Sequence, residues 1–493
     1  MSENSYQLIA ILIYLAGMVL IGWYAYRRTS NLNDYMLGGR GLGPAVSALS
    51  AGASDMSQWL LMGLPGAIYV SGLVEGWLAI GLTIGAWLNW YFVAPRLRVY
   101  TQVSNNSITI PSFFDNRFKD NSQILRIVSG IIILVYFTFY VSSGLVAGGV
   151  FFESSFGYSY HTGLLIVAAV VITYTLIGGF LAVSYTDFVQ GLIMFLALII
   201  IPIFGLSLTG GFESTVESIR TVNPNMLSFF ATASLTGVIS SLAWGLGYFG
   251  QPHIIVRFMA IKSVKETKSA RRIGIGWMIL ALIGAALTAL IGVAYFQQNV
   301  DASLTDPEAI FIVMGQIIFH PFLAGIMLAA VLAAIMSTIS SQLIVTSSAL
   351  VEDIYKAVFR SNASEKTYVI LGRIAVLVVS LTALVFAWQK NDTILSLVSF
   401  AWAGFGAAFG PIILLSLYWR RITGTGALWG MSVGAVTVFV WGNTGLSDVL
   451  YEIVPGFILS LLVTYIVSLV TYKPNKEVEV EFDKTIKLLK KKY

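Results

Sequence analysis

One acidic residue, Asp55, lies in the middle of an apolar stretch that runs from about Pro44 to about Val70. Its neighbours read SALSAGASDMSQWLL over residues 47–61, and many of them are small or carry a hydroxyl. A carboxylate near the centre of a lipid bilayer costs roughly 2.5 to 3.5 kcal/mol even on lenient scales. Glycine and serine allow the backbone to leave helical geometry, which is tolerated at membrane depth only where protein or a cavity satisfies its polar groups. We therefore expect a broken membrane-spanning helix at Asp55, with a purely structural aspartate as the alternative.

A second segment, LAAVLAAIMSTISSQL at residues 328–343, carries hydroxyl groups in an otherwise apolar run. Ala334, Ser337 and Thr338 are spaced i, i+3 and i+4, which places them on one face of a helix. Two hydroxyls on such a face suit a hard monovalent cation, and carbonyl oxygens freed around Ala53 and Met56 would complete its shell. The alternative is that these hydroxyls bond back to their own backbone or to a neighbouring helix.

A further hydroxyl face adjoins this one. Ser340 and Ser341 follow Ser337 at i+3 and i+4, and Asp187 stands after GGFLAVSYT at the start of a predicted span. Three hydroxyls and a carboxylate are a reasonable donor set for a second cation. Asp187 could instead cap its helix near the positive end of the helix dipole, or guide a single ion outward.

The composition indicates the class of protein. Of 493 residues, 57% are hydrophobic and 11% are charged, whereas soluble domains carry about 25% charged residues. Apolar segments of about 18 residues or more recur along the chain, each long enough to cross a hydrocarbon core about 30 Å thick. We predict an all-α polytopic membrane protein with about thirteen transmembrane helices. The predicted spans are approximately 6–26, 44–70, 75–95, 124–152, 161–178, 185–209, 232–258, 273–297, 321–352, 366–388, 394–418, 426–442 and 450–472.

The connections between these spans carry most of the charge. Nearly all of the 29 basic residues fall in alternate connections or in the tail, and only Arg220 and Lys390 fall on the opposite side. The positive-inside rule then places the amino terminus outside and the carboxy terminus in the cytoplasm, with Arg40, Arg117 and Arg257 in cytoplasmic connections. The first span lacks the basic leader of a cleavable signal peptide, so we expect it to be retained.

Several kinds of site are not expected. The chain has no cysteine, which excludes disulfides and thiolate metal sites, and its three histidines are too scattered to share a metal or haem. It has no GxxxxGK[ST] loop, so we do not expect it to hydrolyse ATP by itself. The net charge of +5 follows from the cytoplasmic connections and requires no nucleic acid. The tail is predicted to be solvated or held at the membrane surface by anionic lipid, and a regulatory role for it is an alternative.

A second predicted break lies in the span at 232–258, where SSLAWGLGYFGQPH contains several glycines and a proline. Two broken helices at matching places are typical of transporters with inverted repeats of five helices and a site near the membrane midplane. The GLGYFG spacing also matches a dinucleotide-binding fingerprint, but no strand precedes it, so we reject that interpretation. The predicted organisation is an amino-terminal helix and loop at 1–43, repeats at 44–209 and 232–418, two further helices at 426–472, and a basic tail at 473–493.

Longer motifs resemble one family of membrane transporters. They are SALSAGASDMS, WLLMGLPGA, GLTIGAW, YTLIGGFLAVS, WGLGYFGQPH, LAAIMST and SFAWAGFGAAFGP. These motifs are similar to those of the sodium/solute symporter family, in particular its bacterial members that transport proline. The resemblance implies the 5+5 inverted-repeat fold of bacterial leucine transporters with one extra amino-terminal helix. It also implies sodium-coupled uptake of L-proline by alternating access at the bacterial inner membrane, with sodium as the coupling ion and no other cofactor.

The resemblance also implies roles for individual residues. Asp55 would be the essential carboxylate for sodium, and Arg40 and Ser50 would flank the same broken helix. The implied sodium positions are Ala53, Asp55, Met56, Ala334, Ser337 and Thr338, and the implied substrate-cavity positions are Ser57, Trp59, Tyr140, Trp244 and Tyr248. Aromatic walls suit a pyrrolidine ring with a secondary ammonium, because each cation–π contact contributes about 0.5 to 2 kcal/mol. The substrate carboxylate can lie at a half-helix amino terminus, and packing is the alternative role for the aromatic residues.

Two positions depart from the family motifs, namely Gln58 where glycine is expected and Val141 where cysteine is familiar. Neither removes an implied ligand. Because the family also transports sugars, sialic acid and pantothenate, a sodium symporter for another small carboxylate or amino acid is the main alternative. A channel would need rings of charge or a continuous polar pore, and one buried aspartate fits that poorly. We therefore predict a transporter and not an enzyme, and the sequence does not indicate its oligomeric state.

Overall fold

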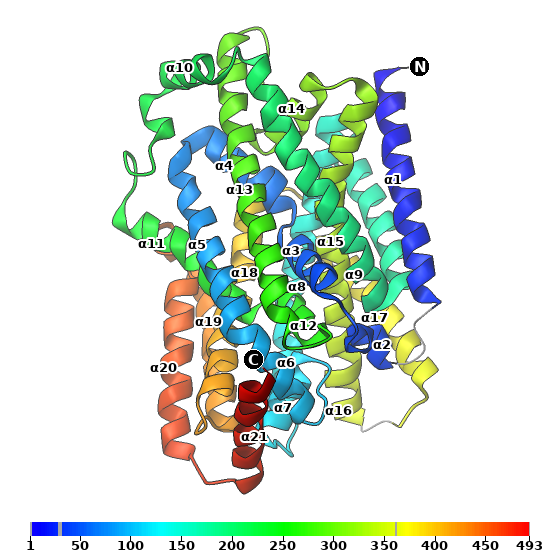
Figure 1. Ribbon diagram of the computed structural model, residues 1–493, viewed down its shortest axis with the longest axis vertical. Helices are drawn as coiled ribbons and strands as arrows, with labels where there is room; N and C mark the ends of the chain where they lie inside the picture. The colour runs from blue at the N-terminus through cyan, green and yellow to red at the C-terminus, as the bar shows by residue number, and fades with distance from the viewer. Residues whose placement is uncertain (1, 28–31, 360–361, 493) are drawn as a thin grey trace.

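The structure, a computed structural model, describes residues 2–27, 32–359 and 362–492. Apart from one isolated bridge between Leu42 and Ile261, the regular elements of these residues are helices, which confirms the predicted all-α class. Ten helical stretches in this part of the chain are long and apolar enough to cross a membrane, and they run alongside one another (Figure 1). The long helices are α1 Glu3–Tyr26, α8 Ile124–Phe156, α9 Tyr160–Leu208, α13 Glu266–Gln298, α15 Pro321–Ser348, α17 Glu365–Phe386, α18 Ile394–Tyr418, α19 Gly424–Gly442 and α20 Ile453–Thr471.

Two of the predicted spans are each split into segments. The first consists of α3 Pro44–Asp55, a π-helical turn η2 Trp59–Gly63, and α4 Leu64–Ser71. The second consists of α11 Leu235–Ala243, a 3-10 turn η6 Trp244–Gly250, and α12 Pro252–Ala260. Both breaks fall where glycine, serine or proline interrupts the apolar sequence, as the sequence analysis predicted.

Two other predicted spans, at 161–178 and 185–209, form the single helix α9 with a kink, where the sequence analysis placed a connection. At the kink Gly179 has φ 62°, a left-handed conformation that glycine adopts without steric cost. The predicted total of about thirteen crossings treats the two parts of α9 as two crossings and each split span as one crossing. That total stays a prediction, because ten stretches of the described residues are long and apolar enough to count as candidate spans.

Shorter helices and extensions complete the architecture. The helix α5 Gly76–Leu88 continues through a π-helical turn η4 Asn89–Val93 into α6 Ala94–Val103. The remaining short helices are α2 Leu32–Leu37, α7 Ile110–Phe118, α10 Phe212–Val222, α14 Ile310–Ile318, α16 Lys356–Phe359 and α21 Lys476–Lys492.

Close packing of small residues positions both broken helices. The largely buried helix α15 packs against α1, α3, α8 and α9, and its many alanine and serine residues permit that close approach. On the other side, α5 packs against η6, where a Cβ on Gly85 would lie within 2.2 Å of the carbonyl oxygen of Gly245. Only glycine at position 85 lets these two backbones meet, and the contact holds η6 against the bundle.

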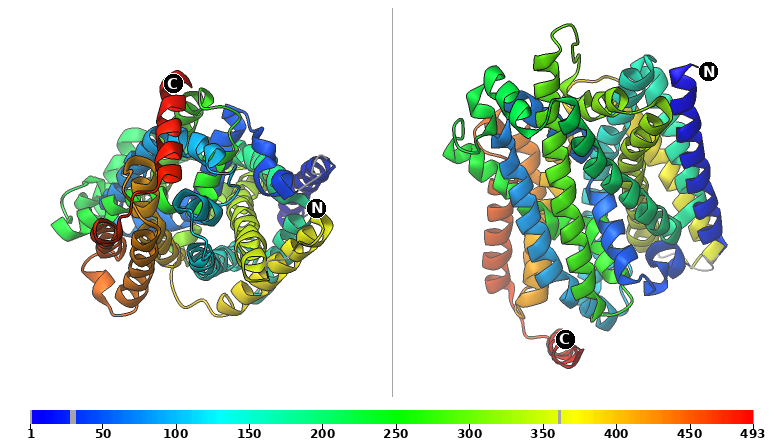
Figure 2. Two further views of the ribbon diagram at one scale, coloured as in Figure 1. Left: turned by 90° about the horizontal axis from the view of Figure 1, so that it is seen from below. Right: turned by 45° about the horizontal axis from the view of Figure 1, so that its top comes forward.

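The tail, which is predicted to be solvated or held at the membrane surface, is a helix that packs against α6. Figure 2 shows α21 lying across the end of the bundle instead of parallel to it. The ammonium of Lys119 lies 2.5 Å from Glu481, and the guanidinium of Arg420 lies 3.1 Å from both Glu479 and Asp483. The prediction rested on the lysines of the tail, whereas acidic residues of α21 make these ion pairs.

Three of the arginines assigned to cytoplasmic connections are buried, and their place on the cytoplasmic side stays a prediction. Arg40 donates to the carbonyl oxygens of Met259 and Ser107, both at 2.7 Å, and burial lowers the pKa of Arg40 to about 10. Arg117 on α7 and Arg257 on α12 are fully buried. From sequence alone each looks like a loop arginine, because the groups that satisfy it come from distant segments.

Candidate functional site

The two broken helices meet at Asp55 and Tyr248. The hydroxyl of Tyr248, on η6, donates a hydrogen bond to Oδ2 of Asp55, the last residue of α3. The indole N–H of Trp59 donates to the main-chain oxygen of Asp55 at 2.9 Å. All three side chains are buried, so the contact lies inside the protein and not at its surface.

The backbone at the first break leaves helical geometry at one residue. Met56 has φ −72° and ψ 70°, and the N–H of Ser57 donates to the carbonyl oxygen of Asp55 at 2.7 Å, outside the regular helical ladder. Carbonyl oxygens in the last turn of a helix lack intrahelical partners, so they can accept from side chains or bind a cation. The break therefore supplies main-chain oxygens next to a carboxylate.

The first predicted cation set is brought together across the interface of α3 and α15. The hydroxyl of Ser337 donates to the carbonyl oxygen of Ala53 at 2.8 Å and lies 3.2 Å from the carbonyl oxygen of Ala334. The hydroxyl of Thr338, on the same face and 1% exposed, has no hydrogen-bond partner among the residues that the structure describes. The hydroxyl of Ser337 and the freed carbonyl oxygen of Ala53 thus meet, and Thr338 follows Ser337 on the same helix, α15.

The carboxylate of Asp55 is turned away from this set. It faces Tyr248, and it lines a small cavity of about 20 Å³ together with Gly52, Asn89 and Met278. Within the described part of the chain its Oδ1 atom has no hydrogen-bond partner, although the residue is only 3% exposed. A buried acceptor without a partner costs about 1 to 3 kcal/mol, more for a charged group, so Oδ1 is a strong attractor for a cation or a donor.

The second predicted cation set already contains a positive charge. Oδ2 of Asp187 accepts from Ser50 at 2.8 Å and from Ser341 at 3.4 Å, and the guanidinium of Arg257 lies 3.1 Å from it. Arg257 also donates to Ser341 at 2.7 Å. Ser340 is not part of this cluster, because its hydroxyl donates to the carbonyl oxygen of Ser337 at 3.1 Å. The sequence analysis did not anticipate the arginine here.

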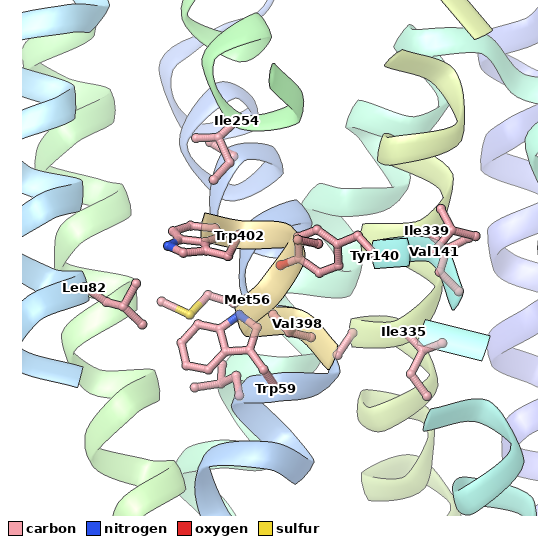
Figure 3. Close-up of a cluster of buried hydrophobic side chains, with 14 of the residues drawn as sticks. Met56, Trp59, Leu82, Tyr140, Val141, Ile254, Ile335, Ile339, Val398 and Trp402 are labelled. Atoms are coloured by element: carbon pink, nitrogen blue, oxygen red, sulfur yellow. The ribbon is translucent and has the colours of Figure 1, made fainter. Parts of the chain in front are cut away.

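Two of the predicted aromatic residues, Trp244 and Tyr248, form an aromatic wall together with Trp402, which was not among the predicted site residues. The indole of Trp402, on α18, donates to the carbonyl oxygen of Trp244 at 2.8 Å, and its ring meets that of Tyr248 edge-on at 5.0 Å. Figure 3 shows Trp402 and Trp59 on either side of Met56, with the hydroxyl of Tyr140 directed toward the two indoles. The motif SFAWAGFGAAFGP contained Trp402, but nothing in its spacing marked it as a site residue.

The segment after the break is tied to α8. Ser57 is fully buried, and its hydroxyl is 3.4 Å from the main-chain N–H of Trp59. The amide of Gln58 donates to the hydroxyl of Ser143 at 2.9 Å, and Ser143 in turn donates to the carbonyl oxygen of Tyr140 at 2.6 Å. Gln58, noted above only as a departure from the family motif, therefore links the broken helix to the helix that carries Tyr140.

This arrangement can bind a small charged molecule with an apolar body. Aromatic rings and the carboxylate of Asp55 offer surfaces for a ring and a cation. The amino-terminal ends of the half-helices offer backbone N–H groups for an anion. Among the described residues, no group of three or more histidine, cysteine, aspartate or glutamate side chains could hold a metal ion. The chemistry therefore points to binding of an organic ion and of a cation held by hydroxyl and carbonyl oxygens.

The sequence matches known transporters over most of its length. The model of the sodium:solute symporter family matches residues 35–434. A high-affinity proline transporter of Bacillus subtilis is 64% identical over 466 residues, which cover 94% of this chain and 98% of that protein. An osmoregulated proline transporter of the same organism is 56% identical, with coverage of 98% and 99%. A sodium/proline symporter of Staphylococcus aureus is 50% identical, with coverage of 98% and 96%.

Solved structures share the fold. A sodium-coupled sialic acid symporter aligns with a TM-score of 0.81 at 21% identity, covering 95% of this chain and 98% of that one. The transporter MhsT, solved with L-phenylalanine, aligns with a TM-score of 0.53 at 15% identity, covering 87% and 98%. The likeness confirms the predicted inverted-repeat fold of the leucine transporter type, and the family match is independent of it. The chain therefore belongs to the sodium:solute symporter family.

Proposed function

We propose that this protein takes up L-proline together with sodium across the bacterial inner membrane. The observation that carries this proposal is the meeting of two broken helices at Asp55 and Tyr248, beside an aromatic wall that suits a pyrrolidinium ring. The names of relatives that are 50% to 64% identical support the same substrate and the same coupling ion. Sodium acts as the driving ion, and no further cofactor takes part.

The first cation set is proposed as the principal sodium site. Ala53 and Ala334 offer main-chain oxygens, Ser337 and Thr338 offer hydroxyls, and the main-chain carbonyl of Met56 would join them. Asp55 acts on this site through its charge, because its side chain bonds Tyr248 and faces away from the hydroxyls. Bound proline would lie between Ser57, Trp59, Tyr140, Trp244 and Tyr248, with Trp402 completing the wall.

The second set, Asp187 with Ser340 and Ser341, is proposed as a sodium site that becomes available when Arg257 withdraws. In the described conformation the guanidinium supplies the positive charge that sodium would supply, so the two cations exclude each other. A buried carboxylate whose partner is removed is strongly destabilised, which favours replacement of one cation by another. Loss of Arg257 from Asp187 and entry of sodium would then be linked events.

The orientation belongs to the same proposal. The amino terminus lies outside, and α21 lies in the cytoplasm. Arg420 pairs with Glu479 and Asp483 of α21, and Arg421 lies over the ring of Tyr472, so these arginines and the lysines of the tail lie at the same end of the protein, in line with the positive-inside rule. Protease treatment tests this orientation. A protease added to the cytoplasmic side of the membrane should cleave the tail, and the same protease added to the outer side should not.

Uptake of labelled proline into proteoliposomes tests the function. An inward sodium gradient should drive accumulation, and an equal potassium gradient should not. Pipecolate and other close proline analogues should compete, whereas glucose, pantothenate and sialic acid should not. Competition by one of these other solutes at concentrations comparable to proline would favour the alternative, a sodium symporter for another small carboxylate or amino acid.

A further inference from the structure

An aromatic residue from outside both predicted repeats reaches the wall of the site. Tyr451 lies just before α20, and its ring stacks on that of Trp244 with centroids 5.4 Å apart and planes at 29°. Tyr451 is 7% exposed, so the stack is shielded from solvent. In Figure 1 the start of α20 lies beside α11, which leads into Trp244. The ring of Tyr451 therefore connects the start of α20 to the wall of the site.

Hydrogen bonds fix the position of the Tyr451 ring. Its hydroxyl donates to the carbonyl oxygen of Ser399 on α18 at 2.6 Å. Its main-chain N–H donates to the hydroxyl of Ser240 on α11 at 3.0 Å. The indole of Trp441 on α19 donates to the carbonyl oxygen of the preceding residue, Leu450, at 2.9 Å. Tyr451 thus has little freedom to turn, and it bridges the outer part of a broken helix and α18.

The stack continues into the wall of the site. The ring of Trp244 also stacks on that of Trp402, with centroids 6.3 Å apart and planes at 28°. Trp402 in turn meets Tyr248, which bonds Asp55. Trp244 is consequently held by two aromatic rings, one from α18 and one from the start of α20. Removal of the ring at position 451 therefore removes one of the two ring contacts that hold Trp244.

We propose that Tyr451 is a positioning residue that fixes the ring of Trp244 and thereby sets the size of ring that the site accepts. The inference rests on the proposed function, because it treats Trp244 as part of the wall around proline. An aromatic pair stabilises a defined ring orientation enough to change an equilibrium about two- to tenfold. Tyr451 acts without touching the substrate, so its effect appears in substrate affinity and selectivity and not in the sodium site.

The test compares five variants by proline uptake in proteoliposomes, normalised to the amount of protein. Tyr451→Leu removes the stack, and Tyr451→Phe keeps it while losing the bond to Ser399. Tyr465→Leu is the matched control, since Tyr465 lies on α20 and stacks on Trp419 at 4.9 Å, away from the site. Trp244→Leu, alone and combined with Tyr451→Leu, tests whether position 451 acts through Trp244.

Tyr451→Leu should raise the apparent KM for proline about two- to tenfold. It should also bring closer together the concentrations of unlabelled proline and of the six-membered pipecolate that halve the uptake of labelled proline. Half-saturation by sodium at saturating proline should not change. Tyr451→Phe and Tyr465→Leu should stay within about twofold of the parent protein, and the double variant should resemble Trp244→Leu alone. Unchanged selectivity in Tyr451→Leu, or additive losses in the double variant, would overturn the proposal. Failure of the parent protein to accumulate proline would instead refute the proposed function itself.

Discussion

The guanidinium of Arg257 and the carboxylate of Asp187 form a fully buried ion pair at 3.1 Å. Arg257 belongs to the second half of one broken helix, and Asp187 belongs to α9 beyond its kink. The same carboxylate accepts from Ser50, just before the break in the other split span. A single buried anion is thus contacted from both broken helices, so movement of either helix changes its surroundings.

If Arg257 moves away from Asp187 during transport, a second sodium ion can bind there, and two sodium ions then accompany each proline. Since proline is zwitterionic, the charge moved per proline equals the number of sodium ions. With a potential near 100 mV worth about 2.3 kcal/mol per charge, and a tenfold gradient worth about 1.4 kcal/mol, one ion supports roughly a 500-fold proline gradient. We expect simultaneous current and tracer flux to give a ratio near two, and Ser341→Ala to lower it toward one.

The control for this measurement is Ser347→Ala, which removes a buried hydroxyl of the same helix that donates to Gly372 and does not contact Asp187. That variant should keep the parent ratio. A ratio of one in the parent protein that Ser341→Ala leaves unchanged would reject the second site.

The charge of Asp55 should be essential for coupling. Asp55→Asn keeps the shape of the side chain and a partner for Tyr248, but it removes the anion that offsets a buried cation. We expect sodium-driven uptake to fall by at least about tenfold while the protein still inserts, because loss of about 1.4 kcal/mol is already a factor of ten. Asp301→Asn, in an exposed connection, is the control and should transport normally. Near-normal uptake at low sodium in Asp55→Asn would contradict this role.

Tyr248 should affect sodium as well as proline, because its hydroxyl bonds Asp55 while its ring meets Trp402. Tyr248→Phe keeps the ring and removes the hydrogen bond, which is worth about 1.5 to 3 kcal/mol when the acceptor is charged. We expect half-saturation by sodium to rise by roughly tenfold or more, with a smaller change in proline affinity. Trp244→Leu should show the reverse pattern. If Tyr248→Phe and Trp244→Leu each changed sodium affinity and proline affinity by the same factor, the two residues would not have these separate roles.

Docking of the tail should depend more on an aromatic contact than on its ion pairs. The ring of Phe482 lies 6.2 Å from that of Tyr100 and 5.6 Å from the guanidinium carbon of buried Arg117. The ion pairs of Arg420 are largely exposed, and such pairs contribute about 0 to 1 kcal/mol. We expect Phe482→Ala to speed proteolytic cleavage near residues 473–475 more than Arg420→Ala does.

The control for the tail is Lys487→Ala, an exposed position of α21 with no ion pair among those observed in the described residues. Added salt should weaken the docking of Phe482→Ala further, since ion pairs alone would remain and these are screened. If Phe482→Ala, Arg420→Ala and Lys487→Ala were cleaved at the same rate, neither the aromatic contact nor the ion pairs of Arg420 would hold α21.

The sequence by itself determined the properties that depend on short stretches of the chain. The spans follow from the length of apolar runs, and the two breaks follow from glycine, serine and proline inside them. The spacing of Ala334, Ser337 and Thr338 placed them on one face, and that face does meet the carbonyl of Ala53. Each of these inferences concerns neighbours along one helix, where geometry is fixed by the backbone.

Only the tertiary structure decided which of these features meet. Asp55 and Tyr248 are 193 positions apart, and no periodicity relates them. Trp402 and Tyr451 are ordinary aromatic residues in sequence, and they join the wall through helix packing alone. Arg257 resembles a residue of a cytoplasmic connection, but Asp187, Ser50 and Ser341 converge on it from three other segments. A buried charge is stable only with such partners, and they are supplied by segments far away in the chain, which local patterns do not encode.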